Sequence, residues 1–218
     1  MIVCPPKKAK FITLEGGEGA GKSTQARLLR DRLEKEGVRT LLTREPGGTP
    51  RAEAIREILL SGKAKPLGPM GEALLFYVAR DSHLELSIRP ALKRGGWVIC
   101  DRFHDSTRAY QGAARGASVS ALDALERIVV GDTQPDLTLM LDLPPEEGLK
   151  RAKARAETAG EGVDRFEEMS LRFHRNLRQE FLDIAKAAPD RCVVIDAKGA
   201  PEDVANAIWR AVVQKLGS

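Results

Sequence analysis

Short apolar segments rich in β-branched residues alternate with longer amphipathic segments along this chain. The apolar segments are almost continuously hydrophobic, which is typical of strands buried on both faces of a parallel sheet. They cover residues 10–15, 38–43, 97–101, 137–142 and 192–196. Helical periodicity predicts helices at residues 25–35, 52–60, 71–93, 119–130, 145–155, 167–187 and 201–216. The alternation predicts an α/β fold, a three-layer α/β/α sandwich built from right-handed βαβ units.

The first apolar segment leads directly into the sequence Gly16-Gly-Glu-Gly-Ala-Gly-Lys-Ser23, and an amphipathic helix follows at once. Glycines allow the backbone to curl so that successive N–H groups point at phosphate oxygens, and the helix start adds donors. Lys22 supplies a cation for the outer phosphates, and the Ser23 hydroxyl is suited to magnesium. In this order the elements predict a nucleoside triphosphate site rather than an ordinary glycine-rich turn. The predicted triphosphate-binding residues are Gly16, Gly17, Glu18, Gly19, Ala20, Gly21, Lys22, Ser23 and Thr24.

The apolar segment at residues 97–101 ends in Asp101, and Arg102 follows it. A motor or helicase ATPase is expected to place a glutamate after the strand-end aspartate, where it activates water. An arginine there favours a kinase, which must gather two polyphosphates that repel each other. Asp101 is then a magnesium-binding residue together with Ser23, and Arg102 binds a phosphate during transfer. The alternative is a surface ion pair at the end of a strand.

Arginines are frequent after the predicted strands and on segments expected to border the same crevice. Guanidinium groups bind phosphate oxygens through paired hydrogen bonds and stay charged when desolvated, as phosphoryl transfer requires. These residues are Arg44, Arg56, Arg80, Arg102, Arg151, Arg155 and Arg165. Solvated surface positions are expected instead for Arg30, Arg32, Arg172 and Arg178.

A phenylalanine and an arginine four residues apart, Phe76 and Arg80, share one face of the long predicted helix. Such a pair can stack on a planar base and donate to its carbonyl edge, although a phenylalanine on such a helix is more often part of the core. Residues 105–112 (Asp-Ser-Thr-Arg-Ala-Tyr-Gln-Gly) offer hydroxyl and amide groups for a base edge, or form a capped helix start.

Composition sets the class of protein. The 218 residues are 42% hydrophobic and 30% charged, with a net charge of +4, which predicts one globular domain spanning residues 1–218. No run of five or more like charges supports a nucleic-acid partner. The sequence shows no signal peptide and no apolar stretch long enough for a membrane span. Three widely spaced cysteines, Cys4, Cys100 and Cys192, are expected to be reduced thiols in a cytoplasmic protein.

Three segments together resemble bacterial thymidylate kinases: Thr43-Arg-Glu-Pro-Gly-Gly-Thr49, Cys100-Asp-Arg-Phe-His-Asp-Ser-Thr-Arg-Ala-Tyr-Gln-Gly112 and Asp164-Arg-Phe-Glu167. The resemblance runs from about Phe11 to the C-terminal helix. It implies a P-loop kinase fold with a five-stranded parallel sheet. It also implies transfer of the γ-phosphate of ATP to dTMP, giving dTDP and ADP in dTTP synthesis, with Mg²⁺. Members are usually homodimers.

The same resemblance implies roles for individual residues. Phe76 stacks on thymine, Arg80 donates to a base carbonyl, and Thr107 and Gln111 complete the base pocket. Arg56 and Arg102 hold the dTMP phosphate, and Glu18 approaches the sugar 3′-hydroxyl. Lys22 and Arg102 are catalytic.

The lid, at about residues 148–165, carries a further catalytic cation in this interpretation. The position after Glu18 is Gly19, and members of the family with glycine there supply the cation from the lid. Arg155, and secondarily Arg151, fits that arrangement within Lys150-Arg-Ala-Lys-Ala-Arg155. Residues 156–162 are small, polar and glycine-containing, and they predict a mobile loop.

Two other functions were compatible with the phosphate loop alone. One is a P-loop kinase with a different acceptor. The Phe76–Arg80 spacing and the Ala-Tyr-Gln-Gly segment disfavour this alternative. The other is a switch or partitioning ATPase, which the missing Asp-Glu pair and the missing basic stripe disfavour.

Overall fold

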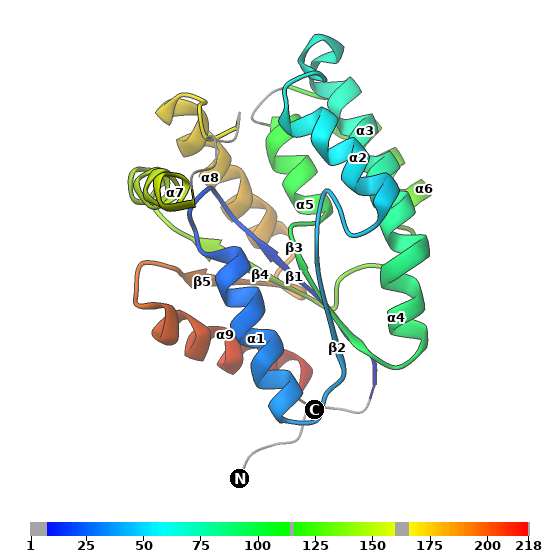
Figure 1. Cartoon of the computed structure of the whole chain (residues 1–218), viewed down its shortest axis with the longest axis vertical. Helices are drawn as coiled ribbons and strands as arrows, with labels where there is room; N and C mark the ends of the chain where they lie inside the picture. Colours follow the sequence, from blue (N-terminus) through cyan, green and yellow to red (C-terminus); the bar gives the residue numbers. More distant parts are fainter. Residues whose placement is uncertain (1–7, 114–115, 160–165, 218) are drawn as a thin grey trace.

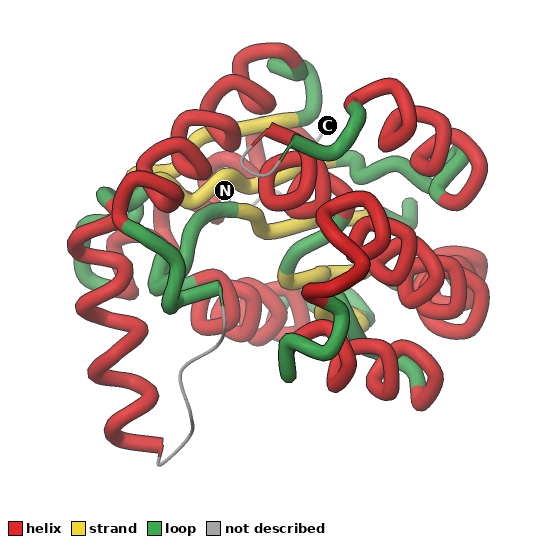
Figure 2. Tube along the Cα trace, turned by 90° about the horizontal axis from the view of Figure 1, so that it is seen from above, coloured by secondary structure: helices red, strands yellow, loops and turns green. Residues whose placement is uncertain are grey.

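The structure is a computed structural model that describes residues 8–113, 116–159 and 166–217. It consists of a central parallel sheet with helices on both faces (Figures 1 and 2). The strand order is β2-β3-β1-β4-β5, and every pairing is parallel. The strands are β1 (Phe11–Glu15), β2 (Thr40–Arg44), β3 (Trp97–Asp101), β4 (Leu137–Asp142) and β5 (Cys192–Asp196). The predicted three-layer α/β/α sandwich with five parallel strands is confirmed.

Alternate residues of the central strands pack against different helix layers. Ile12, Leu14 and Ile99 contribute to a core with α1 (Lys22–Lys35) and α9 (Pro201–Leu216). Phe11 and Val98 face the opposite layer. That layer contains α3 (Gly68–His83), α4 (Arg89–Lys93) and α6 (Val119–Val129), with α8 (Leu171–Ala187) packed farther along the sheet on Met140. Burial on both faces holds for β1, β3 and β4, whereas the edge strands β2 and β5 are only partly buried.

Several helix boundaries differ from the sequence predictions. The helix expected at residues 71–93 is interrupted after α3 by a π-helical segment, Leu84–Ile88, before α4 begins. Helix α8 begins at Leu171 because the Ser170 side chain accepts a hydrogen bond from Phe173 N and caps it. Helix α2 (Pro50–Leu60) is capped in the same way by Thr49. The 3₁₀ segment Lys65–Leu67 precedes α3.

The prediction of a loop at residues 156–162 is wrong for residues 156–159, which are helical. Helix α7 (Pro145–Ala159) continues through Ala156, Glu157 and Thr158, and the Ala156 side chain is buried. Alanine and glutamate are strong helix formers, and the Thr158 hydroxyl donates to Ala154 O within the helix. Residues 160–165, which include Arg165 and the rest of the predicted lid, lie outside the described residues.

The sheet topology places the phosphate loop at the point where the chain changes direction. The chain passes from β1 to the edge strand β2, returns to β3 beside β1, and then continues to β4 on the other side of β1. In open α/β sheets, the crevice outside the carboxyl ends of the strands at such a switch point is the usual ligand site. Among the described residues, no helix is both long enough and apolar enough to span a bilayer.

Candidate active site

A cavity of about 700 Å³ opens at the carboxyl ends of β1, β2 and β3. Its walls come from the phosphate loop, the turn after β2, α3, the segment after β3, and the end of α7. Of the predicted site residues, it brings together Glu18, Gly19, Gly21, Lys22, Ser23, Thr24, Arg56, Phe76, Arg80, Asp101, Arg102, Thr107, Gln111 and Arg155. Gly16, Gly17 and Ala20 shape the loop from outside this cavity.

Backbone geometry requires glycine at two positions of the phosphate loop. Gly16 has φ +138°, and a Cβ there would lie 2.4 Å from Leu141 O. Gly19 has φ +67°, and its Cβ would lie 1.9 Å from Gly148 O at the start of α7. Contacts this short with backbone atoms exclude any side chain. This loop therefore has no room for an arginine at position 19, and Lys22 is the only cation in its sequence.

Lys22 lies buried against its own loop. Its ammonium group donates to Gly17 O at 2.7 Å and to Gly16 O at 3.1 Å. Burial and the neighbouring Arg102 lower the pKa of Lys22 from 10.5 to about 8. Without nucleotide the amine therefore loses its proton near pH 8, and the phosphates of a bound nucleotide would restore the charge.

We expect nucleotide affinity to fall as the pH rises through this pKa. If the charged amine is the binding form, the Kd for ATP rises about tenfold between pH 7 and pH 9. Isothermal titration of wild type and Lys22→Gln across this range is the measurement. The variant should bind weakly and show no such dependence. A wild-type Kd that stays constant to pH 9 would show that Lys22 remains charged.

Ser23 and Asp101 form an oxygen pair beside Lys22. The Ser23 hydroxyl donates to Asp101 Oδ2, joining the first turn of α1 to the end of β3. Hydroxyl and carboxylate oxygens are the hard ligands that Mg²⁺ prefers, and Mg²⁺ on a nucleotide usually takes only one or two protein ligands beside phosphates and waters. The donor set fits this pattern. Clusters of three or more metal-binding side chains are absent from the described ranges.

Arg102 lines the cavity and has an unusual backbone conformation. Its φ is +68°, the one non-glycine residue with positive φ in the described chain. This left-handed conformation is costly for arginine and persists only where the surroundings enforce it. Arg102 N donates to Leu14 O at 2.9 Å, and Nη1 donates to Gly16 O at 3.1 Å. The turn thus directs the guanidinium from the end of β3 onto the phosphate loop.

Glu18 and Tyr110 hold the other side of the Arg102 guanidinium. Arg102 Nη2 donates to Glu18 Oε1 at 2.9 Å and to the Tyr110 hydroxyl at 3.0 Å, and that hydroxyl also donates to Glu18. Burial alone would raise the pKa of Glu18, but Arg102 and Lys22 lower it to about 2. Glu18 is therefore an ionised acceptor throughout the physiological pH range.

A second group of cavity-lining residues has the character of a base pocket. Phe76 is half-buried there, and Arg80 lies behind it on the same helix with a side chain only 1% exposed. Arg80 Nη2 donates to Thr107 Oγ1 at 3.1 Å, and Gln111 Nε2 lies 3.5 Å from Glu72 Oε2. Arg80 Nη1 and Gln111 Oε1 are buried without a hydrogen-bond partner among the described residues. One unpaired donor and one unpaired acceptor are left for a ligand.

The segment carrying Thr107 and Gln111 was predicted either to offer polar groups to a base edge or to form a capped helix start. It forms α5 (His104–Thr107), followed by the π-helical segment Arg108–Ala113. Such π-turns change the helical register and are frequent at functional sites. Here Thr107, Tyr110 and Gln111 all reach the cavity.

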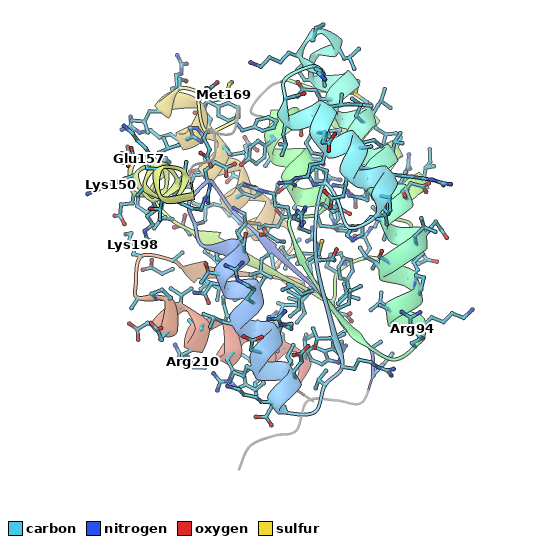
Figure 3. The ribbon with its side chains drawn as sticks, in the orientation of Figure 1. Arg94, Lys150, Glu157, Met169, Lys198 and Arg210 are labelled. Atoms are coloured by element: carbon cyan, nitrogen blue, oxygen red, sulfur yellow. The ribbon has the colours of Figure 1, made fainter. Side chains whose placement is uncertain are left out.

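The structure separates the two arginines predicted for the lid. Arg155 lines the cavity, and its Nη2 donates to Glu167 Oε1 at 2.7 Å. Arg151 instead donates to Ala197 O and Lys198 O at 3.0 and 3.1 Å, outside the residues that line the cavity. In Figure 3 the labelled Lys198 lies in the loop beneath α7, which carries Lys150 and Glu157. The proposed catalytic role of Arg151 therefore has no support in this geometry.

One of the arginines expected at the surface is partly exposed and ion-paired. Arg178, expected to be a solvated surface residue, donates from Nε and Nη2 to both carboxylate oxygens of Asp142 at the end of β4, at 2.6 and 2.8 Å. Arg44 and Arg56 lie beside the cavity as predicted; Arg56 Nη1 donates to Pro46 O at 2.9 Å.

Sequence reasoning assigned no role to two buried carboxylates. Glu15 accepts from Phe103 N at 2.7 Å and from the Ser106 hydroxyl at 2.6 Å, and so fixes the segment after Arg102. Burial and the nearby Asp105 raise the pKa of Glu15. Glu45 accepts from Arg80. A charged residue at the end of an apolar strand was a usable signal for Glu15, whereas the partner of Glu45 is 35 residues away.

The chain is similar to known proteins of one family. Residues 14–208 match the family model described as thymidylate kinase. The thymidylate kinase of Bradyrhizobium sp. (strain ORS 278) is 54% identical, over 97% of this chain and 92% of the relative. That of Caulobacter vibrioides is 56% identical, over 95% and 97%. The crystal structure of thymidylate kinase from Ehrlichia chaffeensis has a TM-score of 0.75 and 34% identity, over 94% of this chain and 99% of that one. The chain belongs to the thymidylate kinase family.

Proposed function

We propose that this chain transfers the γ-phosphoryl group of ATP to dTMP, giving dTDP and ADP, as a step in dTTP synthesis. The observation that carries the proposal is one cavity with two different ends. Lys22 and Ser23 line one part of it and would hold the triphosphate, and Phe76 and Arg80 line another part and would hold the base. Arg102 lies between them, where the acceptor phosphate would meet the donor.

The residues supply what phosphoryl transfer needs, which is positioning and neutralisation of charge. The loop N–H groups and Lys22 hold the donor phosphates. Arg102 and Arg56 hold the acceptor phosphate, whose oxygen is the nucleophile and needs no general base at neutral pH. Arg155, at the end of α7, supplies the cation that Gly19 cannot.

Substrate binding requires Arg102 to exchange partners. In the structure its guanidinium donates hydrogen bonds to Glu18 and to Gly16 O, both of which belong to the phosphate loop. A dTMP phosphate offers oxygens of higher charge to the same fork. Glu18 then has capacity to accept a hydrogen bond from the sugar 3′-hydroxyl.

Mg²⁺ would be held by Ser23 and, directly or through water, by Asp101. When bound with ATP, the ion draws charge from the phosphates that are separated in the reaction. The Ser23–Asp101 hydrogen bond keeps both oxygen atoms together at the loop.

The unpaired groups of the proposed base pocket favour thymine. Arg80 Nη1 can donate to the O4 carbonyl, and Gln111 Oε1 can accept from N3–H. Cytosine reverses both groups, because it has an amino group at position 4 and an acceptor at N3. Buried polar groups left unpaired in this way produce strong discrimination.

A coupled ADP-release assay with dTMP, dUMP, dCMP and no acceptor tests the proposal. We expect ADP release with dTMP far above the rate without acceptor, and a large preference over dCMP. Equal ADP release with and without acceptor would indicate an ATPase. A preference for dCMP would indicate another nucleotide kinase.

We further propose that the chain forms a homodimer through α3 and its neighbours. Leu74 and Val78 lie one helical turn apart on α3 and are 46% and 57% exposed. Ile58 on α2 and Ile128 on α6 are also exposed, and both helices flank α3 (Figure 1). Exposed apolar residues gathered in this way mark interaction surfaces.

Sedimentation equilibrium tests this surface. We expect a dimer for wild type and a monomer for Val78→Asp, because burying a charge in an apolar interface is costly. Val194→Asp, at a position on β5 that is 47% exposed, is the matched control and should remain a dimer. A monomeric wild type, or a dimeric Val78→Asp, would reject the surface.

The proposed compartment is the cytoplasm, and the proposed partners are the two nucleotides and a second copy of the chain, without nucleic acid or membrane. The free cysteines Cys100 and Cys192 are consistent with a reducing compartment.

A further inference from the structure

A buried carboxylate, Glu45, lies behind Arg80 at the base end of the cavity. Glu45 Oε2 accepts from Arg80 Nε at 2.8 Å, and Glu45 Oε1 lies 3.0 Å from His83 Nδ1. The two ion-paired side chains are only 3% and 1% exposed. Charges so buried depend on good hydrogen-bond geometry, because desolvation offsets much of their attraction.

His83, the second partner of Glu45, is itself held in place. His83 Nε2 lies 2.7 Å from Thr43 Oγ1 at the end of β2, so the imidazole is hydrogen-bonded at both nitrogens. The backbone closes tightly over it: a Cβ on Gly48 would lie 2.4 Å from His83 Nε2. Both Glu45 oxygens are therefore held by hydrogen-bond partners, and one of these partners, His83, is itself confined by the backbone at Gly48.

The hydrogen bonds of the Arg80 guanidinium to protein groups leave one of its nitrogens, Nη1, for a ligand. Nε is bonded to Glu45 and Nη2 to Thr107. Nη1 has no partner in the described part of the chain, although it is buried. An unpaired buried donor favours a ligand that places an acceptor beside it, and disfavours one that places a second donor there.

We propose that Glu45 is a positioning residue for base selectivity: it holds the Arg80 guanidinium so that Nη1 meets a carbonyl rather than an amino group of the base. The inference rests on the proposed function, because it assigns the selectivity of that same pocket. Glu45 acts through Arg80 and is not assigned to the phosphates. It therefore affects the choice and affinity of the acceptor base, with the transfer step and ATP binding unchanged.

The experiment compares Glu45→Gln with wild type using dTMP and dCMP as acceptors. A neutral amide is nearly the same size but cannot bind both Arg80 and His83 as an ionised acceptor. We expect the KM for dTMP to rise about 10- to 100-fold, with kcat and the KM for ATP little changed. The kcat/KM for dCMP should not fall in parallel, so the dTMP-to-dCMP preference decreases.

A matched control is available in the chain. Glu126 accepts from Arg108 Nε at 2.9 Å and lies 3.3 Å from His104 Nδ1, so it has the same kinds of partner outside the cavity lining. Glu126→Gln should lower the thermal midpoint, as Glu45→Gln does, yet leave the dTMP-to-dCMP preference unchanged. If Glu45 had a purely structural role, both variants would have a lower thermal midpoint and an unchanged dTMP-to-dCMP preference.

A double variant tests whether Glu45 acts through Arg80. Glu45→Gln should change the base preference no further when Arg80→Ala is already present. If Glu45→Gln fails to fold, Glu45→Asp keeps the charge but is too short for both partners, and the same measurements apply. An unchanged preference in the folded variant, or an equal further loss in the Arg80→Ala background, would overturn the inference. Failure of the wild type to phosphorylate dTMP would instead overturn the proposed function.

Discussion

Arg102→Ala is expected to lower kcat for dTMP phosphorylation by about 10²-fold or more while the protein remains folded. The side chain lies between the phosphate loop and the base pocket, and its guanidinium can meet the acceptor phosphate from there. Removing it takes away one of the cations that offset the repulsion between the donor and acceptor phosphates. Steady-state kinetics with dTMP and ATP, together with a thermal melt, measure the two effects separately.

Two further variants sharpen this expectation. Arg102→Lys keeps a positive charge but loses the fork that binds two oxygens, and should recover only part of the rate. Arg108→Ala removes an arginine six residues away whose partners, Asp123 and Glu126, lie outside the cavity lining. It should keep a near-normal kcat. Near-normal turnover of Arg102→Ala would refute the role given to Arg102.

Arg155→Ala is expected to lower kcat by about 10²- to 10³-fold with a small change in the KM for dTMP, because a cation that meets the phosphoryl group during transfer acts mainly on the transition state. In the structure Arg155 borders the cavity and is bonded to Glu167. Gly19 leaves no room for an arginine in the loop, and Arg155 is the further cation that we assign to the transferring phosphoryl group. Single-turnover kinetics at saturating ATP isolate the transfer step.

Arg151→Ala is the matched comparison, on the same helix and one turn earlier. Arg151 is bonded to the carbonyls of Ala197 and Lys198, so its loss should affect kcat far less than the loss of Arg155. A larger loss of kcat for Arg151→Ala than for Arg155→Ala would reverse the assignment.

Much of the site could be predicted because its signals are local in the sequence. The phosphate loop needs a strand, closely spaced glycines, a lysine and a helix, all within residues 11–35. Asp101 and Arg102 follow an apolar strand whose end must lie at the ligand edge of the sheet. Phe76 and Arg80 share a helix face by spacing alone.

The remaining features depend on contacts between distant segments or on small shifts of register. The π-helical turn at Arg108–Ala113 has no distinctive composition, and it directs Tyr110 and Gln111 into the cavity. The separation of Arg151 from Arg155 depends on carbonyls after β5, 46 and 47 residues farther along the chain. The Glu45–Arg80 pair forms only when the turn after β2 packs against α3.

The most direct test of the central claim follows the phosphoryl group itself. The protein is incubated with ATP labelled in the γ-phosphate, Mg²⁺ and dTMP, and the label is quantified in dTDP and in inorganic phosphate. Transfer within the cavity predicts label in dTDP in equal amount to the ADP formed, with little inorganic phosphate. ADP formation with the label in inorganic phosphate, and none in dTDP, would contradict the account.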